Sequence, residues 1–264
     1  MKRLLLILPL ALAATSSSLA ASSPAAQERA QVRLIAESGL RAGAYHAAVV
    51  VDLAPDTITY WRNPGDAGVP PTFDFSASDN LQGARVTMPA PSRIAEADGE
   101  ALGYRDRLVM PLAVTPKDAG KPVRLEMKFD YAACARICVP MHADEVLILQ
   151  PNGAASADAA LIAQTEAIVP KPATLAEAGA LERIKADKPS FLFTPKNGGA
   201  LDLFADAPDG YFITTRKQGA GFLITIADAP NDAPAPPAPV ALTLTREQGA
   251  LEFPAPLDAP APAR

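Results

Sequence analysis

Short apolar segments, each interrupted by proline, glycine or aspartate after a few residues, recur along most of this chain of 264 residues. Segments of this length that are rich in β-branched and aromatic residues are typical of β-strands. The stretch 123–129 alternates strictly between apolar and polar side chains, which predicts a strand with one buried face. Proline and glycine dominate the stretch 63–71, which predicts a turn rather than a helix or central strand. The pattern therefore predicts an all-β fold, an antiparallel β-sandwich.

The composition changes after residue 150 and predicts a second region. Strands of the sandwich are expected at 32–37, 45–53, 57–61, 72–75, 84–88, 108–114, 123–132 and 145–149. Helices are expected at 159–169 and 175–184, and a proline-rich loop at 229–239. We expect this division of the chain: a signal peptide at 1–20, a β-sandwich at 28–152, a short helical connector at 153–186, a second smaller β-domain at 187–254 and a disordered tail at 255–264.

The first residues indicate export. Lys2 and Arg3 precede a short apolar run, and small residues follow up to Ala21. This is the pattern of a cleavable signal peptide, and the run is too short to span a bilayer. No later stretch is apolar enough to be membrane-spanning, so we expect a periplasmic protein. The net charge of −5 and the lack of a basic run make nucleic acid a poor partner.

Cys134 and Cys138 are the only cysteines, and three residues separate them at the end of an apolar stretch. A disulfide between them closes a very small ring, so it removes little entropy from the unfolded chain. We therefore interpret the pair as a redox-active disulfide that opens and closes. An inert structural disulfide in a non-catalytic binding module stays an alternative.

The residues around the pair bear on its chemistry. Arg136 and His142 favour a thiolate, whereas Asp130 opposes one, and Pro140 helps to expose the pair. Thiolates, a thioether and an imidazole would also suit copper(I), which makes a copper-binding metallochaperone a second alternative. Its four ligands would lie within nine residues: Cys134, Cys138, Met141 and His142.

Several of these stretches resemble one family. The stretch 103–112, Gly-Tyr-Arg-Asp-Arg-Leu-Val-Met-Pro-Leu, resembles the amino-terminal periplasmic domain of DsbD, the thiol:disulfide interchange protein. So does Phe-Asp-Tyr at 129–131, followed by the cysteine pair and Val-Pro at 139–140. The stretch 60–71, Tyr-Trp-Arg-Asn-Pro-Gly-Asp-Ala-Gly-Val-Pro-Pro, is similar to the ScsB branch of that family. The resemblance covers about residues 30–150.

The resemblance implies an immunoglobulin-like β-sandwich that passes reducing equivalents through Cys134 and Cys138, without any cofactor. It implies a membrane-embedded thiol protein as electron donor, and periplasmic thioredoxin-like proteins, including disulfide isomerases, as acceptors. Full-length relatives continue into a membrane-embedded carrier and a thioredoxin-like domain, so we expect either a separate protein as the donor here or a different flow of electrons. By analogy, Cys138 forms the mixed disulfide and Cys134 resolves it.

The family also predicts a cover for the disulfide. DsbD places an aromatic ring over its disulfide from a cap loop, whereas the matching stretch 96–102 here has no aromatic residue. We expect Tyr104, Leu102 or Trp61 to take that place. Five residues are thus candidates for the surroundings of the cysteine pair: Tyr104, Tyr131, Arg136, Pro140 and Trp61.

Overall fold

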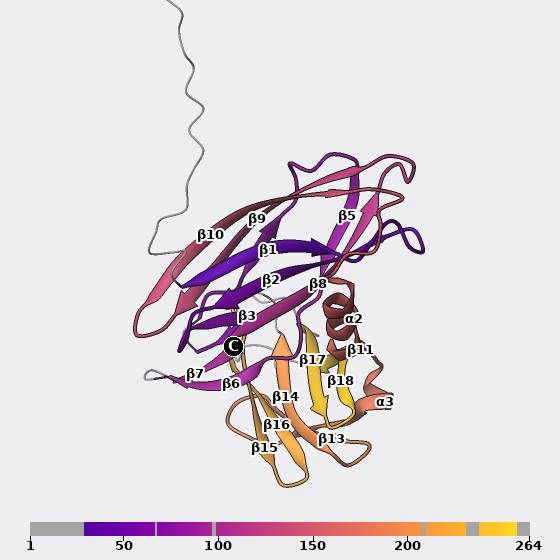
Figure 1. Ribbon diagram of the computed structural model, residues 1–264. Helices are drawn as coiled ribbons and strands as arrows, with labels where there is room; N and C mark the ends of the chain where they lie inside the picture. Colours follow the sequence, from indigo (N-terminus) through magenta and orange to yellow (C-terminus); the bar gives the residue numbers. More distant parts are fainter. Residues whose placement is uncertain are drawn as a thin grey trace, which may run out of the picture.

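The computed structural model is built mainly from antiparallel strands, arranged as two β-units that pack against each other (Figure 1). It describes residues 29–66, 68–96, 99–206, 208, 210–230 and 238–257. The expected signal peptide lies outside this part of the chain, and so does most of the expected tail. The all-β fold is confirmed. No helix in the described ranges is long and apolar enough to cross a membrane.

The first unit is the immunoglobulin-like sandwich. One sheet contains, in spatial order, β1 (Ala30–Ala36), β2 (Tyr45–Leu53), β8 (Arg107–Pro116) and β5 (Leu81–Val86). The other contains β10 (Cys138–Leu149), β9 (Val123–Cys134), β3 (Ile58–Gly65), β7 (Gly99–Arg105) and β6 (Ser92–Glu96), and β4 (Thr72–Asp74) pairs with β9. Alternate residues of the strands fill the space between the sheets, because successive side chains point to opposite faces. The largest include Met110, Leu112, Leu125, Met127 and Phe129.

Two features of this unit differ from the sequence-based expectation. β3 continues to Gly65, so the start of the expected turn at 63–71 is strand; an irregularity in its pairing with β7 accommodates Pro64. β6 and β7 were not expected at all. Their sequences have little β-branched content, and their pairing with each other and with β3 makes them strands.

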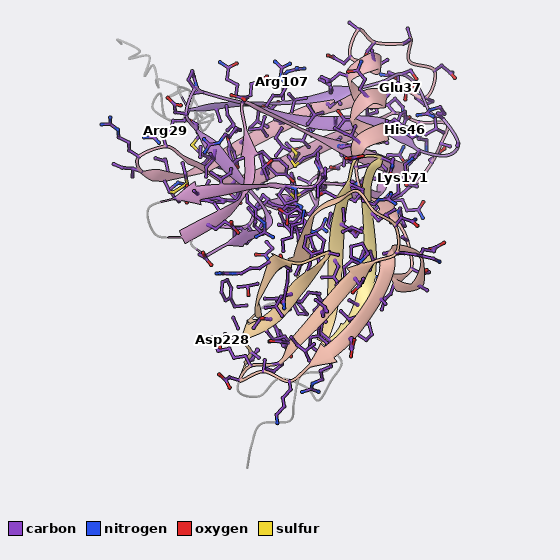
Figure 2. All side chains as sticks on the ribbon, turned by 90° about the horizontal axis from the view of Figure 1, so that it is seen from below. Arg29, Glu37, His46, Arg107, Lys171 and Asp228 are labelled. Atoms are coloured by element: carbon purple, nitrogen blue, oxygen red, sulfur yellow. A yellow bond between two sulfur atoms is a disulfide. The ribbon has the colours of Figure 1, made fainter. Side chains whose placement is uncertain are left out.

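The connector belongs to both units. Helix α2 (Ala159–Ile168) forms close to its expected place, and its buried Ile162 packs on the outer face of the first sheet. His46 of β2 forms a hydrogen bond of 2.6 Å with Glu166 of α2. This contact lies at the end of the first unit opposite to Arg29 (Figure 2).

The second expected helix is wrong beyond its first turn. Helix α3 (Leu175–Ala178) begins with a capping box between Thr174 and Glu177, but Gly179–Ile184 is strand β12. β12 pairs with β13 (Ser190–Pro195) so closely that a Cβ on Gly179 would lie 2.2 Å from the Thr194 carbonyl oxygen. The apolar residues of this segment fit a helical period, and the strand pairing overrides it.

The second unit has two four-stranded sheets and a core of its own. One sheet contains, in spatial order, β11 (Lys171–Pro172), β18 (Gly249–Leu257), β17 (Ala238–Arg246) and β14 (Ala200–Asp206). The other contains β12, β13, β16 (Gly221–Asp228) and β15 (Phe212–Gln218). Phe193, Phe222 and Phe253 are among the residues buried between the two sheets. β18 extends past residue 254 because Ala255 and Leu257 are buried in this core.

Candidate redox site

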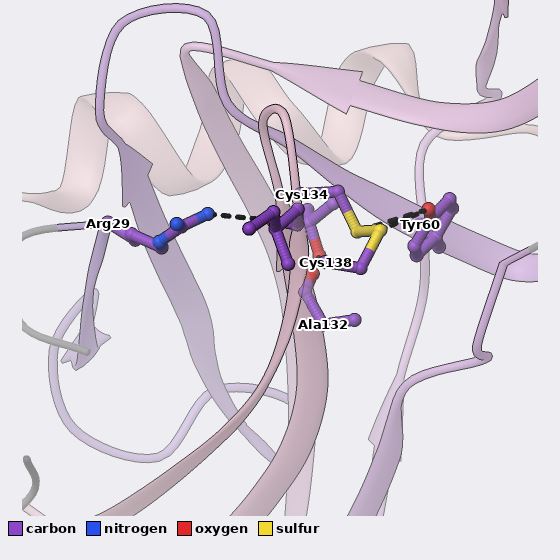
Figure 3. The surroundings of a disulfide bond; sticks show 7 residues. Arg29, Tyr60, Ala132, Cys134 and Cys138 are labelled. Atoms are coloured by element: carbon purple, nitrogen blue, oxygen red, sulfur yellow. Dashed lines mark hydrogen bonds between the residues drawn. A yellow bond between two sulfur atoms is a disulfide. The ribbon is translucent and has the colours of Figure 1, made fainter. Parts of the chain in front are cut away.

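The cysteines close the hairpin of β9 and β10. The two strands pair without interruption from Val123 opposite Leu149 to Cys134 opposite Cys138, and residues 135–137 form the turn. Directly opposite residues in an antiparallel pair share a face of the sheet. The register therefore places the two sulfur atoms side by side, and they form a disulfide (Figure 3).

The two cysteines differ in their access to solvent. Cys134 is 1% exposed, whereas Cys138 is an exposed residue at the start of β10. The turn beside it presents Ile137, which is 68% exposed. Arg29 holds that turn by donating a hydrogen bond of 2.8 Å from Nη1 to the Ile137 carbonyl (Figure 3). A molecule approaching the hairpin tip therefore reaches Cys138 before Cys134.

Tyr60 contacts both sulfur atoms. Its hydroxyl lies 3.1 Å from Cys134 Sγ and donates a hydrogen bond to it, and it lies 3.4 Å from Cys138 Sγ (Figure 3). Burial raises the pKa of Tyr60 above its ordinary value, and the negative charge of Glu96 adds to this effect. The hydroxyl therefore keeps its proton at neutral pH and remains a hydrogen-bond donor.

The buried sulfur lies in a small apolar cluster on the outer face of the sheet. Its members come from four neighbouring strands: Ile58 and Tyr60, Ala132 and Cys134, Ala101, and Ile94. This cluster is separate from the main core between the sheets. An apolar site disfavours a thiolate, because burial penalises the charged form. The Tyr60 hydroxyl is the polar group that offsets this penalty at Cys134.

The segment after β3 packs on the Tyr60 ring. A Cβ added to Gly68 would lie 2.6 Å from Cδ1 of that ring and 2.3 Å from Cβ of Pro64. The backbone at Gly68 therefore touches the ring, and this position has no room for a side chain. The segment that the sequence predicted as a turn thus covers the residue that contacts the sulfurs.

Comparison with known proteins agrees with this geometry. Residues 25–150 match the family model described as the amino-terminal domain of the thiol:disulfide interchange protein DsbD. This part of the chain is a DsbD amino-terminal-like domain. The resemblance seen in the sequence is thereby confirmed. No curated protein matches the sequence.

A solved structure shares the fold of most of the chain. The crystal structure of the N-terminal periplasmic domain of ScsB from Proteus mirabilis matches with a TM-score of 0.68 at 22% sequence identity. The match covers 88% of this chain and 95% of that one. Because this coverage far exceeds residues 25–150, the shared fold includes the second β-unit as well as the DsbD-like domain.

Three aromatic candidates lie on the other face of the disulfide-bearing sheet of the DsbD-like domain. Trp61 follows Tyr60 on β3 and is therefore directed into the main core. Tyr131 stacks on Phe129 there, and burial raises its pKa to about 12. Tyr104 donates a hydrogen bond of 2.6 Å to the Pro89 carbonyl, and burial raises its pKa well above the ordinary value. The structure does not bring these rings to the disulfide.

The other candidates lie at the hairpin itself. Arg136 is exposed in the turn, and Pro140 is exposed on β10 opposite Ala132, two residues from Cys138 on the same face. Tyr60, which does contact the sulfurs, was missed as a site residue. Its place next to Trp61 indicates only that the two side chains face opposite sides of the strand; the contact with the sulfurs follows from the pairing of Ile58 with Cys134.

The four residues considered for copper do not converge. Met141 is buried in the main core, on the opposite face from the disulfide. His142 lies four residues along β10 from Cys138, about 13 Å at the rise of a strand. It lies between two carboxylates, with Nδ1 2.6 Å from Asp130 and Nε2 3.1 Å from Asp144. Within the described ranges, no group of three or more His, Cys, Asp or Glu residues is placed to hold a metal ion.

Proposed function

We propose that the chain is a thiol–disulfide exchange module that relays reducing equivalents through Cys134 and Cys138. One observation carries the proposal: a disulfide with an exposed and a buried sulfur, with the Tyr60 hydroxyl in contact with both. An inert disulfide needs neither an accessible sulfur nor a proton donor beside the buried one. An exchange site needs both, because one sulfur is attacked and the other must leave.

The oxidised form accepts electrons in two steps. A thiolate of the donor attacks Cys138 Sγ, the bond to Cys134 breaks, and Cys134 leaves with the electron pair as a thiolate. The second donor thiolate then attacks the donor sulfur of the mixed disulfide and releases Cys138. The donor is now a disulfide, and the pair has gained two electrons and takes up two protons.

Delivery follows the reverse order. The exposed Cys138 thiolate attacks the disulfide of the acceptor, and the acceptor's first sulfur leaves as a thiolate. Cys134 then attacks Cys138 Sγ, which reforms the internal disulfide and releases the reduced acceptor. In both directions Tyr60 donates its hydrogen bond to Cys134 while that sulfur carries negative charge, which offsets the cost of a buried thiolate.

The family supports an inference about the partners and the compartment. We infer a membrane-embedded thiol protein as donor, and thioredoxin-like proteins, including disulfide isomerases, as acceptors. The amino-terminal apolar run supports export to the periplasm. The ScsB structure that shares this fold is of a domain described as periplasmic, which is consistent with this location.

Trapping a mixed disulfide tests this function. We expect reduced Cys134→Ser protein to form a stable mixed disulfide with a thioredoxin variant that keeps only its attacking cysteine, activated as a mixed disulfide with thionitrobenzoate. Cys138 attacks the thioredoxin sulfur, thionitrobenzoate leaves, and neither protein has a second thiol to resolve the product. The Cys138→Ser protein should form none, and neither variant should complete electron transfer. Complete transfer by either single variant would end the proposal, and trapping only by Cys138→Ser would reverse the assigned roles.

The reduction potential of the pair is the second measurement. A relay requires a value between those of thioredoxin and the strong periplasmic oxidants, about −270 to −120 mV. A structural disulfide lies below about −300 mV. Equilibration of the oxidised protein in defined thiol buffers, followed by trapping of free thiols, distinguishes the two.

A further inference from the structure

The second β-unit holds the strand that carries Tyr60. We propose that its docking positions the Tyr60 hydroxyl against the sulfurs, with Arg62 as the positioning residue. The inference rests on the proposed exchange function and assigns a role in it to the second unit.

Three consecutive residues after Tyr60 contact the second unit. The Trp61 ring packs edge-on against Phe204 of β14, with 6.1 Å between centroids. Arg62 Nε lies 2.6 Å from Asp206 Oδ2, and its Nη2 contacts Glu252 of β18. Asn63 Nδ2 donates a hydrogen bond of 2.6 Å to the Ala205 carbonyl. The half of β3 beyond Tyr60 is therefore anchored outside its own domain.

The neighbouring strand β6 repeats this arrangement. Ile94 belongs to the apolar cluster around Cys134, and the adjacent Arg93 reaches the second unit. Arg93 forms a two-pronged pair with Asp202, at 2.7 and 3.0 Å, and donates 2.9 Å hydrogen bonds to the Leu203 carbonyl and Thr215 Oγ1. Two of the four strands that form the disulfide cluster are thus held by arginines from the same side.

The cover of Tyr60 starts from the anchored residues. The segment that packs Gly68 on the Tyr60 ring begins after Gly65, the last residue of β3 and two residues beyond Asn63. Asn63, near the end of β3, is hydrogen-bonded to the second unit, and the segment that follows the strand touches the ring. The backbone of Tyr60 is therefore held by β3, and its ring is covered by the segment after β3. Both of these elements adjoin residues that contact the second unit.

The contacts between β3, β6 and the second unit fix the relative positions of these strands. The Arg62 and Arg93 side chains are only about a quarter exposed, and Arg62 also lies 4.5 Å above the Trp61 ring. Arg93 donates several hydrogen bonds here, and Arg62 donates one to Glu252 beside its ion pair with Asp206. Such contacts are directional, because the planar guanidinium fixes the positions of its partners. A shift of the interface therefore displaces β3, and the hydroxyl at 3.1 Å from Cys134 moves with it.

The test breaks the Arg62–Asp206 ion pair in the full chain, by substituting either the arginine or the aspartate. We expect Arg62→Gln and Asp206→Asn to slow reduction of the disulfide by dithiothreitol by about two- to thirtyfold, the range of coupling through packed contacts. Arg41→Gln is the matched control, because Arg41 pairs with Glu37 and Glu166 at the opposite end of the first unit. Its reduction rate should equal that of the unchanged protein.

A double-mutant cycle separates positioning from general destabilisation. If Arg62 acts through Tyr60, Arg62→Gln must have no further effect on the reduction rate in a Tyr60→Phe background. An effect of full size in that background overturns the inference, as does an unchanged rate in both Arg62→Gln and Asp206→Asn. The reductant is a small dithiol, so the measured rate is meaningful even if the protein passes no electrons to other proteins. Conversely, an unchanged rate in the variants would not contradict electron transfer between proteins.

Discussion

At the scale of single residues, the chemistry of the site depends on which groups surround a buried sulfur. Cys134 lies among Ile58, Ile94, Ala101 and Ala132, where a thiolate is costly. Tyr60 is the hydroxyl placed to stabilise that thiolate, and its raised pKa keeps it a donor. The expected cover by Tyr104, Leu102 or Trp61 is not what the structure has: all three belong to the main core on the other face of this sheet.

We expect Tyr60→Phe to raise the pKa of the Cys134 thiol. Loss of one hydrogen bond to the thiolate costs about 1 kcal/mol, which lowers the thiolate fraction at a given pH by about fivefold. The pH dependence of alkylation by iodoacetamide, followed by mass spectrometry on a Cys138→Ser background, measures this shift. Tyr104→Phe on the same background is the control, since its hydroxyl bonds to Pro89 on the opposite face. Equal thiol pKa values in both variants would exclude a role for Tyr60.

At the scale of elements, the β9–β10 hairpin was predictable because its pattern is local. The alternation at 123–129 predicted a half-buried strand, and β9 buries Val123, Leu125, Met127 and Phe129 as that pattern requires. The position of Tyr60 was not predictable in this way. It follows from the pairing of Ile58 with Cys134, residues 76 positions apart, and from the alternation of β3 around that pair. The register between strands that are distant in sequence cannot be predicted from a short stretch of sequence.

The same limit explains the elements that the sequence did not predict. Residues 179–184 have helical spacing, but β13 pairs with them and makes a strand. Residues 68–71 lie outside the strands, as the sequence predicted, yet the packing on Tyr60 depends on Gly68, whose contact partner lies on the preceding strand. Local patterns thus predicted the fold class and the cysteine pair, while the surroundings of the sulfurs came from tertiary packing.

The hairpin also carries a pH-dependent contribution to stability. Hydrogen bonding to Asp130 raises the pKa of His142, burial opposes this, and Asp144 adds to the rise. A histidine whose pKa is higher in the folded state stabilises most below its unfolded value of about 6.5, and this is lost as pH rises through the folded pKa.

We therefore expect His142→Gln to destabilise the protein at pH 5.5 and to have almost no effect at pH 9. The loss should stay below about 1 kcal/mol, because the three side chains are about half exposed or more and solvent screens them. Urea unfolding at the two pH values measures it. Lys128→Gln, on the same face of the hairpin, changes a charge that does not titrate in this range and serves as control. An equal loss at both pH values would contradict the assignment.

At the scale of the whole molecule, the two β-units share an interface rather than only a connector. Trp61, the sole tryptophan, is fully buried and joins Phe204 of the second unit to the core of the first. Helix α2 packs on the first unit while β11 pairs with β18 of the second, so the connector is bound at both ends. Figure 1 shows the second unit below the first, with α2 beside their junction. Such an arrangement favours cooperative unfolding of the pair.

Phe204→Ala tests this coupling at the interface. Removing a buried phenylalanine costs about 3–5 kcal/mol, and here it also opens the environment of Trp61. We expect lower stability in urea and a red shift of the native tryptophan emission. Phe191→Ala is the matched control, because Phe191 is buried in the core of the second unit without contacting Trp61. It should lower stability without shifting the native emission. If Phe204→Ala left the emission unchanged, the two units would not be joined through Trp61. The second unit would then not position β3, the strand that carries Tyr60, through this contact.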